Sequence, residues 1–494
     1  MKIAYIGNQG GAAVHDFYSG MARAMAGTDS GTEPVFGVWL DTEKAALEGQ
    51  GWHASSVHSF AAWVRGRGQP DEAEIGRLRR DYGEVNWSEV VAAERAFTDY
   101  SMLLGAAGER REDAAYVLRL VANIATFIER ILTEVGVRAM VCQTADTLFS
   151  LIAFRIAAHY RIPVYAICPA WLLEPGAAGG GFFVNNEFLE SERMIEGGRR
   201  LGLRALDPDE VARADRLRAA ITGFAGKTAF GAKNKGVRAG MTALSPNLRG
   251  LFGYLLANAR RDRNVEYVKI DPWRKLRANL LRLWRKRATA RWMGPKSTDA
   301  IPPRSVFFAL HYQPEQSTLA QNIWQVNQVA CVEDISKSLP LGYTLVVKEH
   351  PWGRGNRPLW QYRHMSRLYN VVFCDAPAKE IVRRVDAVVV GTGTIGIEAM
   401  ALDKPVIALG RSFYTHGDLV YRADSARDLP EILKRILVDG DFAAQADRET
   451  RLRRFLLAYL DAMIPHFPTV ENAGHYGRAL AVELGIGAGK RRTA

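Results

Sequence analysis

Residues 387–410 read AVVVGTGTIGIEAMALDKPVIALG, and this stretch decides the fold. Its first four residues are small or β-branched and apolar, which is typical of a buried strand. The glycines at 391 and 393 predict a tight turn, and a helical pattern follows up to Leu402 before Lys404-Pro405 introduces a second apolar run. Because a helix joins two short apolar strands, this unit predicts a parallel sheet with a crossover helix.

The same alternation extends along the chain on both sides of this unit. We expect strands over residues 305–310, 343–347 and 371–373, and a long helix over 316–337. In the first part of the chain we expect strands over 2–6, 35–40, 138–142 and 163–168, helices over 15–26 and 147–159, and a Gly-rich loop over 7–11. The pattern predicts an α/β fold with two doubly wound, Rossmann-like domains.

These expectations divide the chain into four parts. They are an N-terminal Rossmann-like domain (1–184), a helical and basic interdomain segment (185–300), a C-terminal Rossmann-like domain (301–445), and a C-terminal helix with a basic tail (446–494). The interdomain segment contains one strand-like run, Val265–Ile270. Two such domains are expected to face each other across a cleft, where the carboxyl ends of the strands bind ligands.

Composition excludes several classes of protein. The 494 residues are 48% hydrophobic, which excludes a disordered chain, and no apolar run is long enough for a spanning helix. The first apolar run is too short for a signal peptide, and the four cysteines have no paired spacing that would indicate disulfides or zinc. The sequence therefore predicts a cytoplasmic globular protein. Of its net charge of +12, residues 260–298 carry +10.

Three loops, each following an expected strand of the second domain, form the candidate site. They are His311-Tyr-Gln-Pro-Glu315, Lys348-Glu-His-Pro351 and Gly391–Ala399. In the third loop, glycines allow backbone amides to approach an anion, Thr392 and Thr394 add hydroxyls, and the following helix points its positive end at the same place. Glu398 is suited to accept the hydroxyls of a ribose. The alternative is a simple strand-to-helix turn with Thr as the helix cap.

The other two loops have two interpretations each. Lys348 and His350 are two residues apart at a strand end, so they are expected on one side of the sheet, where they suit a phosphate or a leaving group. Pro351 holds the turn after them. The alternative for this loop is a surface Lys–Glu pair beside a structural histidine.

In the first loop, the Gln313 amide is suited to bind a base edge or a ribose. The alternative is that Pro314 and Glu315 only begin the next helix.

Together, the HYQPE, KEHP and GTGTIGIEAMALDKPVIALG motifs resemble those of the capsule polysaccharide synthesis family, over about residues 305–415. That family comprises GT-B-type glycosyltransferases, including capsular Kdo transferases. The resemblance implies that this domain binds the nucleotide of a sugar donor, through Gln313-Pro314, Lys348, His350-Pro351, Thr392, Gly393, Thr394 and Glu398. It favours a CMP-sugar such as CMP-Kdo, with UDP- or GDP-sugars left open. Asp403 departs from the family's usual glycine, which is expected to affect only the helix C-cap.

The catalytic carboxylate is then expected in the first domain. Asp146, between a strand end and a helix, is the first candidate, as a general base or to stabilise a cationic centre; its alternative role is a helix N-cap. Glu174 is the second, and His15 and Asp16 are the third. No DxD motif capable of holding a metal between a carboxylate and a diphosphate appears, so we expect no metal and no cofactor other than the nucleotide-sugar substrate.

The basic segment predicts an amphipathic helix. Trp273, Leu276, Leu280 and Trp284 recur at spacings of three and four, with the basic residues Arg274, Lys275, Arg282, Arg285 and Lys286 between and beside them. This pattern suits an anionic surface, either the inner membrane or an acidic glycan, through Trp273, Arg274, Trp284, Arg285 and Lys286. The alternative is an apolar stripe packed on the protein with solvated charges. No motif that reads a nucleic-acid groove is present, so no nucleic-acid partner is expected.

The sequence therefore predicts a glycosyltransferase that moves a sugar from a nucleotide-sugar donor to a capsule, other surface polysaccharide or glycolipid acceptor. Two alternatives stay open. One is a sugar-nucleotide 2-epimerase, because Val141–Thr147 of this chain resembles a strand-end motif of those enzymes. The other is a non-catalytic GT-B-like scaffold in polysaccharide assembly.

Overall fold

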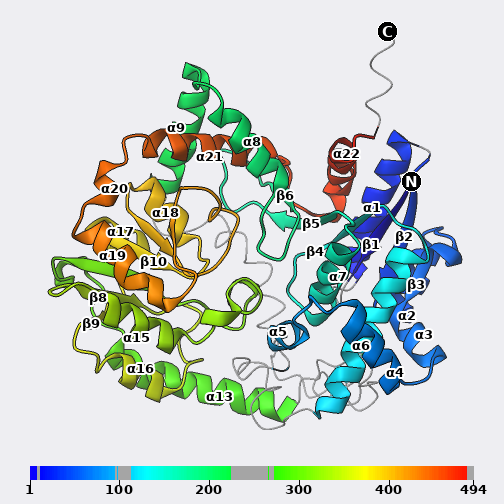
Figure 1. Ribbon diagram of the computed structural model, residues 1–494, viewed down its shortest axis with the longest axis horizontal. Coiled ribbons are helices and arrows are strands. Elements are labelled where there is room, and N and C mark those ends of the chain that lie inside the picture. Colours follow the sequence, from blue (N-terminus) through cyan, green and yellow to red (C-terminus); the bar gives the residue numbers. More distant parts are fainter. Residues whose placement is uncertain are drawn as a thin grey trace.

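The computed structural model describes residues 1–7, 12–29, 31–94, 97, 113–223, 265 and 272–486, and the side chains of 272–276 are outside that description. The chain forms two α/β domains, seen side by side in Figure 1. Of the expected strands, Val265–Ile270 falls outside the described residues except for Val265. The basic tail after residue 486 and residues 8–11 of the Gly-rich loop also fall outside them.

The first domain is built on a six-stranded sheet of order β3-β2-β1-β4-β5-β6. Its strands are β1 (Lys2–Ile6), β2 (Glu33–Val38), β3 (Val57–Ser59), β4 (Ala139–Gln143), β5 (Val164–Pro169) and β6 (Gly181–Val184). All neighbours pair in parallel except β5 and β6, which are antiparallel. The helices are α1 (Ala12–Thr28), α2 (Asp41–Gly49), α3 (Phe60–Gly66), α4 (Glu72–Asp81), α5 (Trp87–Ala92), α6 (Ala114–Thr133) and α7 (Leu148–His159). Of these strands, β3 and β6 are not predicted by the sequence, because β3 has only three residues and β6 follows a glycine run.

The second domain repeats this plan with a parallel sheet of order β12-β11-β10-β7-β8-β9. Its strands are β7 (Ser305–Ala309), β8 (Thr344–Lys348), β9 (Val371–Phe373), β10 (Ala387–Val390), β11 (Val406–Ala408) and β12 (Tyr421–Arg422). Its helices are α14 (Gln316–Leu319), α15 (Gln328–Ser338), α16 (Leu359–Met365), α17 (Ala378–Arg384), α18 (Ile395–Ala401), α19 (Leu429–Leu437) and α20 (Asp441–Ala444). The prediction of two doubly wound, Rossmann-like domains is confirmed.

The expected long helix over 316–337 is wrong. The chain forms the single turn α14, a 3₁₀ turn (Ile323–Gln325) and then α15. The side chain of Asn327 accepts hydrogen bonds from the amides of Val329 and Ala330 and so begins a new helix. This break matters because it leaves residues 320–327 to form a loop beside the candidate site.

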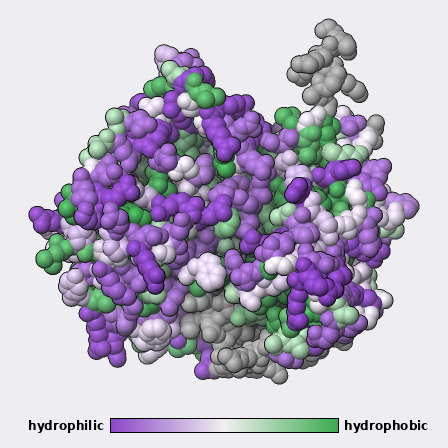
Figure 2. All heavy atoms as spheres, viewed as in Figure 1, coloured by the Kyte–Doolittle hydropathy of each residue, from purple (hydrophilic) through white to green (hydrophobic). Residues whose placement is uncertain are grey.

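Both faces of each sheet are covered by helices. In the first domain, α1 and α2 pack on one face and α3, α4, α6 and α7 on the other. In the second, α15, α16 and α19 pack on one face and α17 and α18 on the other. Further 3₁₀ turns cover Ala54–Ser56, Ala290–Trp292, Thr298–Ala300, Ala426–Asp428 and Val470–Asn472. Hydrophilic residues dominate the molecular face in Figure 2.

Helices outside the two sheets join the domains. The interdomain segment contributes α8 (Glu192–Gly202), α9 (Pro208–Gly223) and α13 (Pro272–Ala288). The expected C-terminal helix is α21 (Arg448–Ala462), which packs on α8 and α9. The chain then returns to the first domain, where α22 (Ala473–Glu483) packs on α1. Because α22 completes the core of the first domain, the last part of the chain belongs physically to both halves.

The carboxyl ends of the two sheets approach each other through loop contacts. Trp171, just after β5, stacks on Phe413, after β11, with ring centroids 4.3 Å apart and planes at 14°. Nearby, Arg411 donates to the Glu190 carboxylate at 2.7 Å. Tyr459 of α21 holds the Trp171 loop, since its hydroxyl accepts the backbone N–H of Trp171 at 2.9 Å and of Leu172 at 3.0 Å. These contacts fix the two strand-end edges relative to each other.

Candidate functional site

The three predicted loops meet at one edge of the second sheet. They follow β7, β8 and β10, which are neighbours in that sheet, so their carboxyl ends lie together. His311, after β7, lies directly against the glycine turn after β10. A Cβ at Gly391 would lie 2.8 Å from His311 Nε2, and one at Gly393 would lie 3.1 Å from His311 Cε1. At Gly391 the close approach of the imidazole leaves no room for a side chain.

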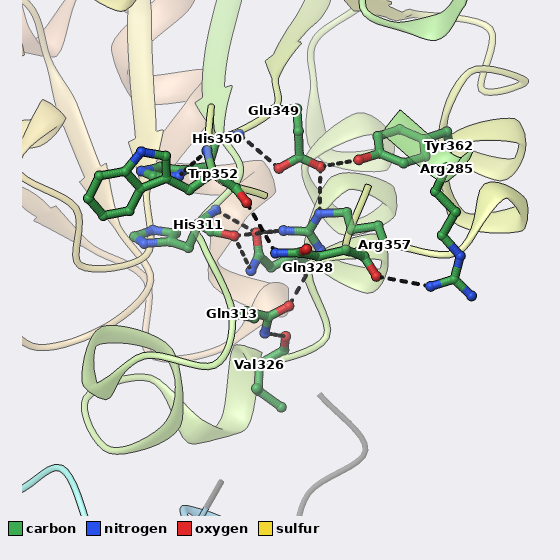
Figure 3. Close-up of polar contacts among 11 residues, drawn as sticks. Arg285, His311, Gln313, Val326, Gln328, Glu349, His350, Trp352, Arg357 and Tyr362 are labelled. Atoms are coloured by element: carbon green, nitrogen blue, oxygen red, sulfur yellow. Dashed lines mark hydrogen bonds and ion pairs between the residues drawn. The ribbon is translucent and has the colours of Figure 1, made fainter. Parts of the chain in front are cut away.

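A buried ion pair holds the loop after β8, as Figure 3 shows. Arg357 Nε donates to Glu349 Oε2 at 2.7 Å, and both side chains are almost fully buried. The Tyr362 hydroxyl donates to the same oxygen at 2.6 Å, and the backbone N–H of His350 donates to Oε1 at 2.8 Å. The Glu349 carboxylate therefore has a counter-charge and further hydrogen-bond donors. A buried carboxylate requires such partners.

Arg357 also joins this loop to the loop after β7 (Figure 3). Its Nη2 donates to the His311 carbonyl at 2.7 Å and to Gln328 Oε1 at 3.0 Å. Gln328 in turn accepts the His311 backbone N–H at 2.7 Å and donates to its carbonyl at 3.2 Å. The backbone of His311 is therefore fixed by two side chains, and its imidazole is left to face the glycine turn.

The two histidines of the site are neutral near pH 7. Burial, together with smaller effects of His350 and Arg357, lowers the pKa of His311 to about 4. Burial also lowers the pKa of His350, against the opposing effect of Glu349. The backbone N–H of Trp352 donates to His350 Nδ1 at 3.2 Å, so the proton of the neutral ring is on Nε2. His350 can therefore offer an Nε2–H donor without carrying a charge.

The glycine turn presents its amides outward. The Tyr414 hydroxyl donates to the Gly393 carbonyl at 2.6 Å, and the Gly396 amide donates to it at 3.1 Å. Because the peptide is planar and trans, fixing this carbonyl directs the N–H of Thr394 the opposite way. Within the described part of the chain, no group accepts a hydrogen bond from the amides of Thr392, Gly393 or Thr394. Such amides suit an anion.

The polar side chains of this turn differ in their availability. The Thr392 hydroxyl donates to the Ser317 carbonyl at 2.8 Å and is buried. Thr394 begins α18 without a side-chain cap bond, so the alternative of a Thr cap does not hold for it. The Glu398 carboxyl makes no hydrogen bond to another described residue, and burial raises its pKa. Thr394 and Glu398 therefore retain free polar groups, whereas the Thr392 hydroxyl proton is used within the protein.

Two predicted contacts are engaged elsewhere. Lys348 Nζ lies 3.2 Å from Asp375 Oδ1, and Arg354 donates to the same oxygen. Lys348 therefore pairs with a carboxylate near the end of β9. Gln313 Nε2 donates to the Val326 carbonyl at 2.7 Å, so that the amide closes its own loop.

The prolines shape these loops. The Gln313–Pro314 peptide is cis, and Pro351 lies in a turn closed by the Gly353 amide on the His350 carbonyl at 2.8 Å.

Asp403, the departure from the family's glycine, does lie at the C-terminal end of α18. Its φ is +57°, a left-handed conformation that glycine adopts most easily and Asp tolerates. Arg448 donates to its carboxylate at 2.9 and 3.0 Å, which lowers the pKa of that carboxyl. The substitution therefore adds a contact to α21.

The candidate carboxylates of the first domain occupy different surroundings. Asp146 precedes Thr147, and Thr147 is the residue that caps α7, so the alternative cap role of Asp146 is wrong. Asp146 lies close enough to raise the pKa of the buried Tyr18 hydroxyl and Cys142 thiol beyond the effect of burial. Glu174 lies 3.6 Å from the Arg213 guanidinium in a partly exposed pair.

The third-choice residues are also engaged. His15 Nε2 lies 3.2 Å from Glu43 Oε1 in a buried pair, and Asp16 accepts the Gln50 side-chain amide at 2.6 Å.

Sequence reasoning named His311 only as the first residue of the loop after β7, without a role, and missed Arg357 and Tyr414. His311 had a usable signal, because it lies at the carboxyl end of a strand, two residues after β7 ends. Arg357 and Tyr414 had none, since each lies in an irregular loop and reaches its partner only through the fold.

We predict that Glu349→Gln lowers the free energy of unfolding by about 3–5 kcal/mol, because it leaves the buried Arg357 guanidinium without its counter-charge. Glu333→Gln is the matched control. Its carboxylate pairs with the exposed His364 and Lys337, and an exposed pair contributes at most about 1 kcal/mol. Urea denaturation of both variants measures the difference; equal losses would contradict the role of the pair.

We also predict a pH-dependent stability that depends on His311. Its pKa is 6.5 in the unfolded chain and about 4 in the folded protein, so the unfolded chain binds more protons between these values. The free energy of unfolding then falls as pH drops from 6.5 toward 4, by at most about 3 kcal/mol from this group. His311→Gln removes this contribution and leaves the backbone bonds to Arg357 and Gln328. The measurement is the free energy of unfolding against pH for the wild-type protein and His311→Gln. Curves that run parallel between pH 6.5 and 4 would refute the role of His311.

Comparison with known proteins gives one family and several relatives. Residues 331–428 match the family described as capsule polysaccharide biosynthesis protein. The chain is 26% identical over 172 residues to the capsule polysaccharide export protein KpsS of Escherichia coli, covering 32% of this chain. It spans 43% of the length of that relative, less than half.

Two solved structures are similar at a coarse level. The Thermosulfurimonas dismutans KpsC beta Kdo 2,7 transferase has 12% identity and a TM-score of 0.35, covering 72% of this chain and 89% of that one. Anabaena Alr3699/HepE in complex with UDP-glucose has 12% identity and a TM-score of 0.29, covering 98% and 100%. Residues 331–428, which contain the KEHP and GTG loops, match the capsule polysaccharide biosynthesis family, so the resemblance predicted from these motifs is confirmed.

Proposed function

We propose that the protein is a GT-B-type glycosyltransferase that moves a sugar from a nucleotide-sugar donor to a capsule, other surface polysaccharide or glycolipid acceptor. The observation that carries this proposal is the glycine turn, whose Thr394 amide points away from the Tyr414-bound carbonyl. The turn lies at the carboxyl edge of a doubly wound sheet and inside the segment that matches the capsule family. An outward amide at that position suits a nucleotide phosphate.

The donor phosphate would contact the amides of Gly393 and Thr394, the Thr394 hydroxyl and His350 Nε2–H. Because His350 is neutral, it offers a hydrogen bond that strengthens as negative charge develops on the leaving phosphate. Glu398 would accept ribose hydroxyls as a carboxylate. Gln313, Lys348 and Thr392 would support these loops, because their polar groups are already bonded within the protein.

The reaction breaks the bond between the anomeric carbon and the phosphate oxygen and forms one to an acceptor hydroxyl. The acceptor proton must leave, and Asp146 of the first domain is the proposed base. Its surroundings support this assignment, since its charge lies beside the buried Tyr18 hydroxyl and Cys142 thiol. A CMP-sugar such as CMP-Kdo is the donor that the resemblance favours, and the proposal requires no metal.

The proposal predicts that His350→Ala lowers kcat for sugar transfer by roughly 10²-fold or more, because one donor to the leaving phosphate is lost. The assay is nucleotide release that depends on an acceptor glycan, with cytidine, uridine and guanosine donors compared. His364→Ala is the control, since that exposed histidine pairs only with Glu333 on the surface. Unchanged kcat in His350→Ala would contradict the assignment. Product formation from the donor without acceptor would instead indicate an epimerase.

A further inference from the structure

Helix α13 is mounted on the second domain with its apolar side outward. Leu283 and Trp284 lie three and four residues after Leu280, and the three residues are 60% (Leu280), 58% (Leu283) and 56% (Trp284) exposed. An amphipathic helix of a globular protein normally buries such a stripe. The expectation that the stripe packs on the protein therefore fails for these residues. Trp273 and Arg274, also expected to contribute, have side chains outside the described ones.

The opposite side of α13 contacts the protein through polar groups. Arg282 Nη2 donates to the Trp352 carbonyl at 3.4 Å, and Arg285 Nη1 donates to the Asn356 carbonyl at 3.3 Å. Burial lowers the pKa of Arg285. Gly355 allows this approach, because its φ is +85° and a Cβ there would lie 2.4 Å from the Arg282 carbonyl oxygen. Arg285 therefore anchors the helix and does not belong to its outward face, contrary to the sequence-based expectation.

The charge of α13 is entirely of one sign. Its 17 residues, PWRKLRANLLRLWRKRA, include seven Lys or Arg and no Asp or Glu. Lys286 and Arg287 are exposed beside Trp284, and within the described residues neither forms a hydrogen bond or ion pair through its side chain. In Figure 1, α13 runs along the outer edge of the second domain next to α16.

These features select among partners. A second copy docking through the same face would place two helices of uniform positive charge against each other, which is unfavourable. An acidic glycan would pair with the cations and leave the leucines and the tryptophan in water. An anionic lipid surface satisfies both, since the headgroups attract Lys and Arg while the interface accepts Leu and Trp.

We propose that α13 docks the protein on anionic lipid bilayers, with Leu280, Leu283 and Trp284 entering the interface and Lys286 and Arg287 contacting the headgroups. No described helix has the length and apolarity to cross a bilayer, so the docking is by one face of α13. The proposal is independent of glycosyl transfer, because it concerns a surface outside the three site loops.

The test is co-sedimentation of the full chain with vesicles of phosphatidylcholine alone or mixed with phosphatidylglycerol. We expect binding to the mixed vesicles only, weakened by salt, and a loss of roughly tenfold or more in affinity for the variant Leu280→Ser/Leu283→Ser/Trp284→Ser. Lys286→Gln/Arg287→Gln is expected to weaken binding as well. Leu203→Ser/Leu341→Ser is the control, since both side chains are strongly exposed elsewhere and should leave binding unchanged.

Three outcomes would overturn the proposal. One is no binding of the wild-type protein to either vesicle. Another would indicate a glycan site. In that outcome the apolar triple variant binds vesicles fully, the charge variant loses vesicle binding, and a soluble anionic polysaccharide competes with the vesicles for the protein. The last is a wild-type dimer, measured by sedimentation velocity, that the apolar triple variant abolishes.

Discussion

The buried ion pair between Glu349 and Arg357 is the interaction on which the site depends. Burying two charges is costly, and the structure offsets that cost by giving the carboxylate three donors and the guanidinium several acceptors. Because one of those acceptors is the His311 carbonyl, the pair fixes the loop after β7 relative to the loop after β8. The positions of both site histidines follow from it.

A second set of contacts connects these fixed loops to the glycine turn and to the first domain. His311 lies against Gly391 and Gly393, so the loop fixed by Arg357 also limits the turn. Tyr414 fixes the Gly393 carbonyl, and its neighbour Phe413 stacks on Trp171 of the first domain. The turn that we propose for the donor phosphate is therefore bonded to the same loop that joins the domains. Movement between the domains would reach the phosphate site through Tyr414.

The fold was readable from the sequence where periodicity was strong. The strands that form the centres of both sheets, and the turn after β10, were predicted from short apolar runs bounded by glycine and proline. The prediction of one long helix over 316–337 failed, because Asn327 caps a new helix and so interrupts a sequence pattern that otherwise looks continuous. At the site, residues at strand ends were predictable, whereas Arg357 and Tyr414 lie in loops whose paths are set by tertiary contacts. The orientation of α13 was not readable either, since its polar side is held by carbonyls of a distant loop.

The central claim is that a nucleotide phosphate binds at the glycine turn, in contact with the Thr394 amide and His350 Nε2–H. A crystal structure of the protein with the nucleotide that most raises its Tm tests this directly, since a ligand that binds the native state alone stabilises it. The account predicts phosphate oxygens within hydrogen-bond distance of the Thr394 amide and His350 Nε2, with Glu398 on the ribose. A nucleotide bound elsewhere, or a phosphate held by Lys348 after displacing Asp375, would contradict it.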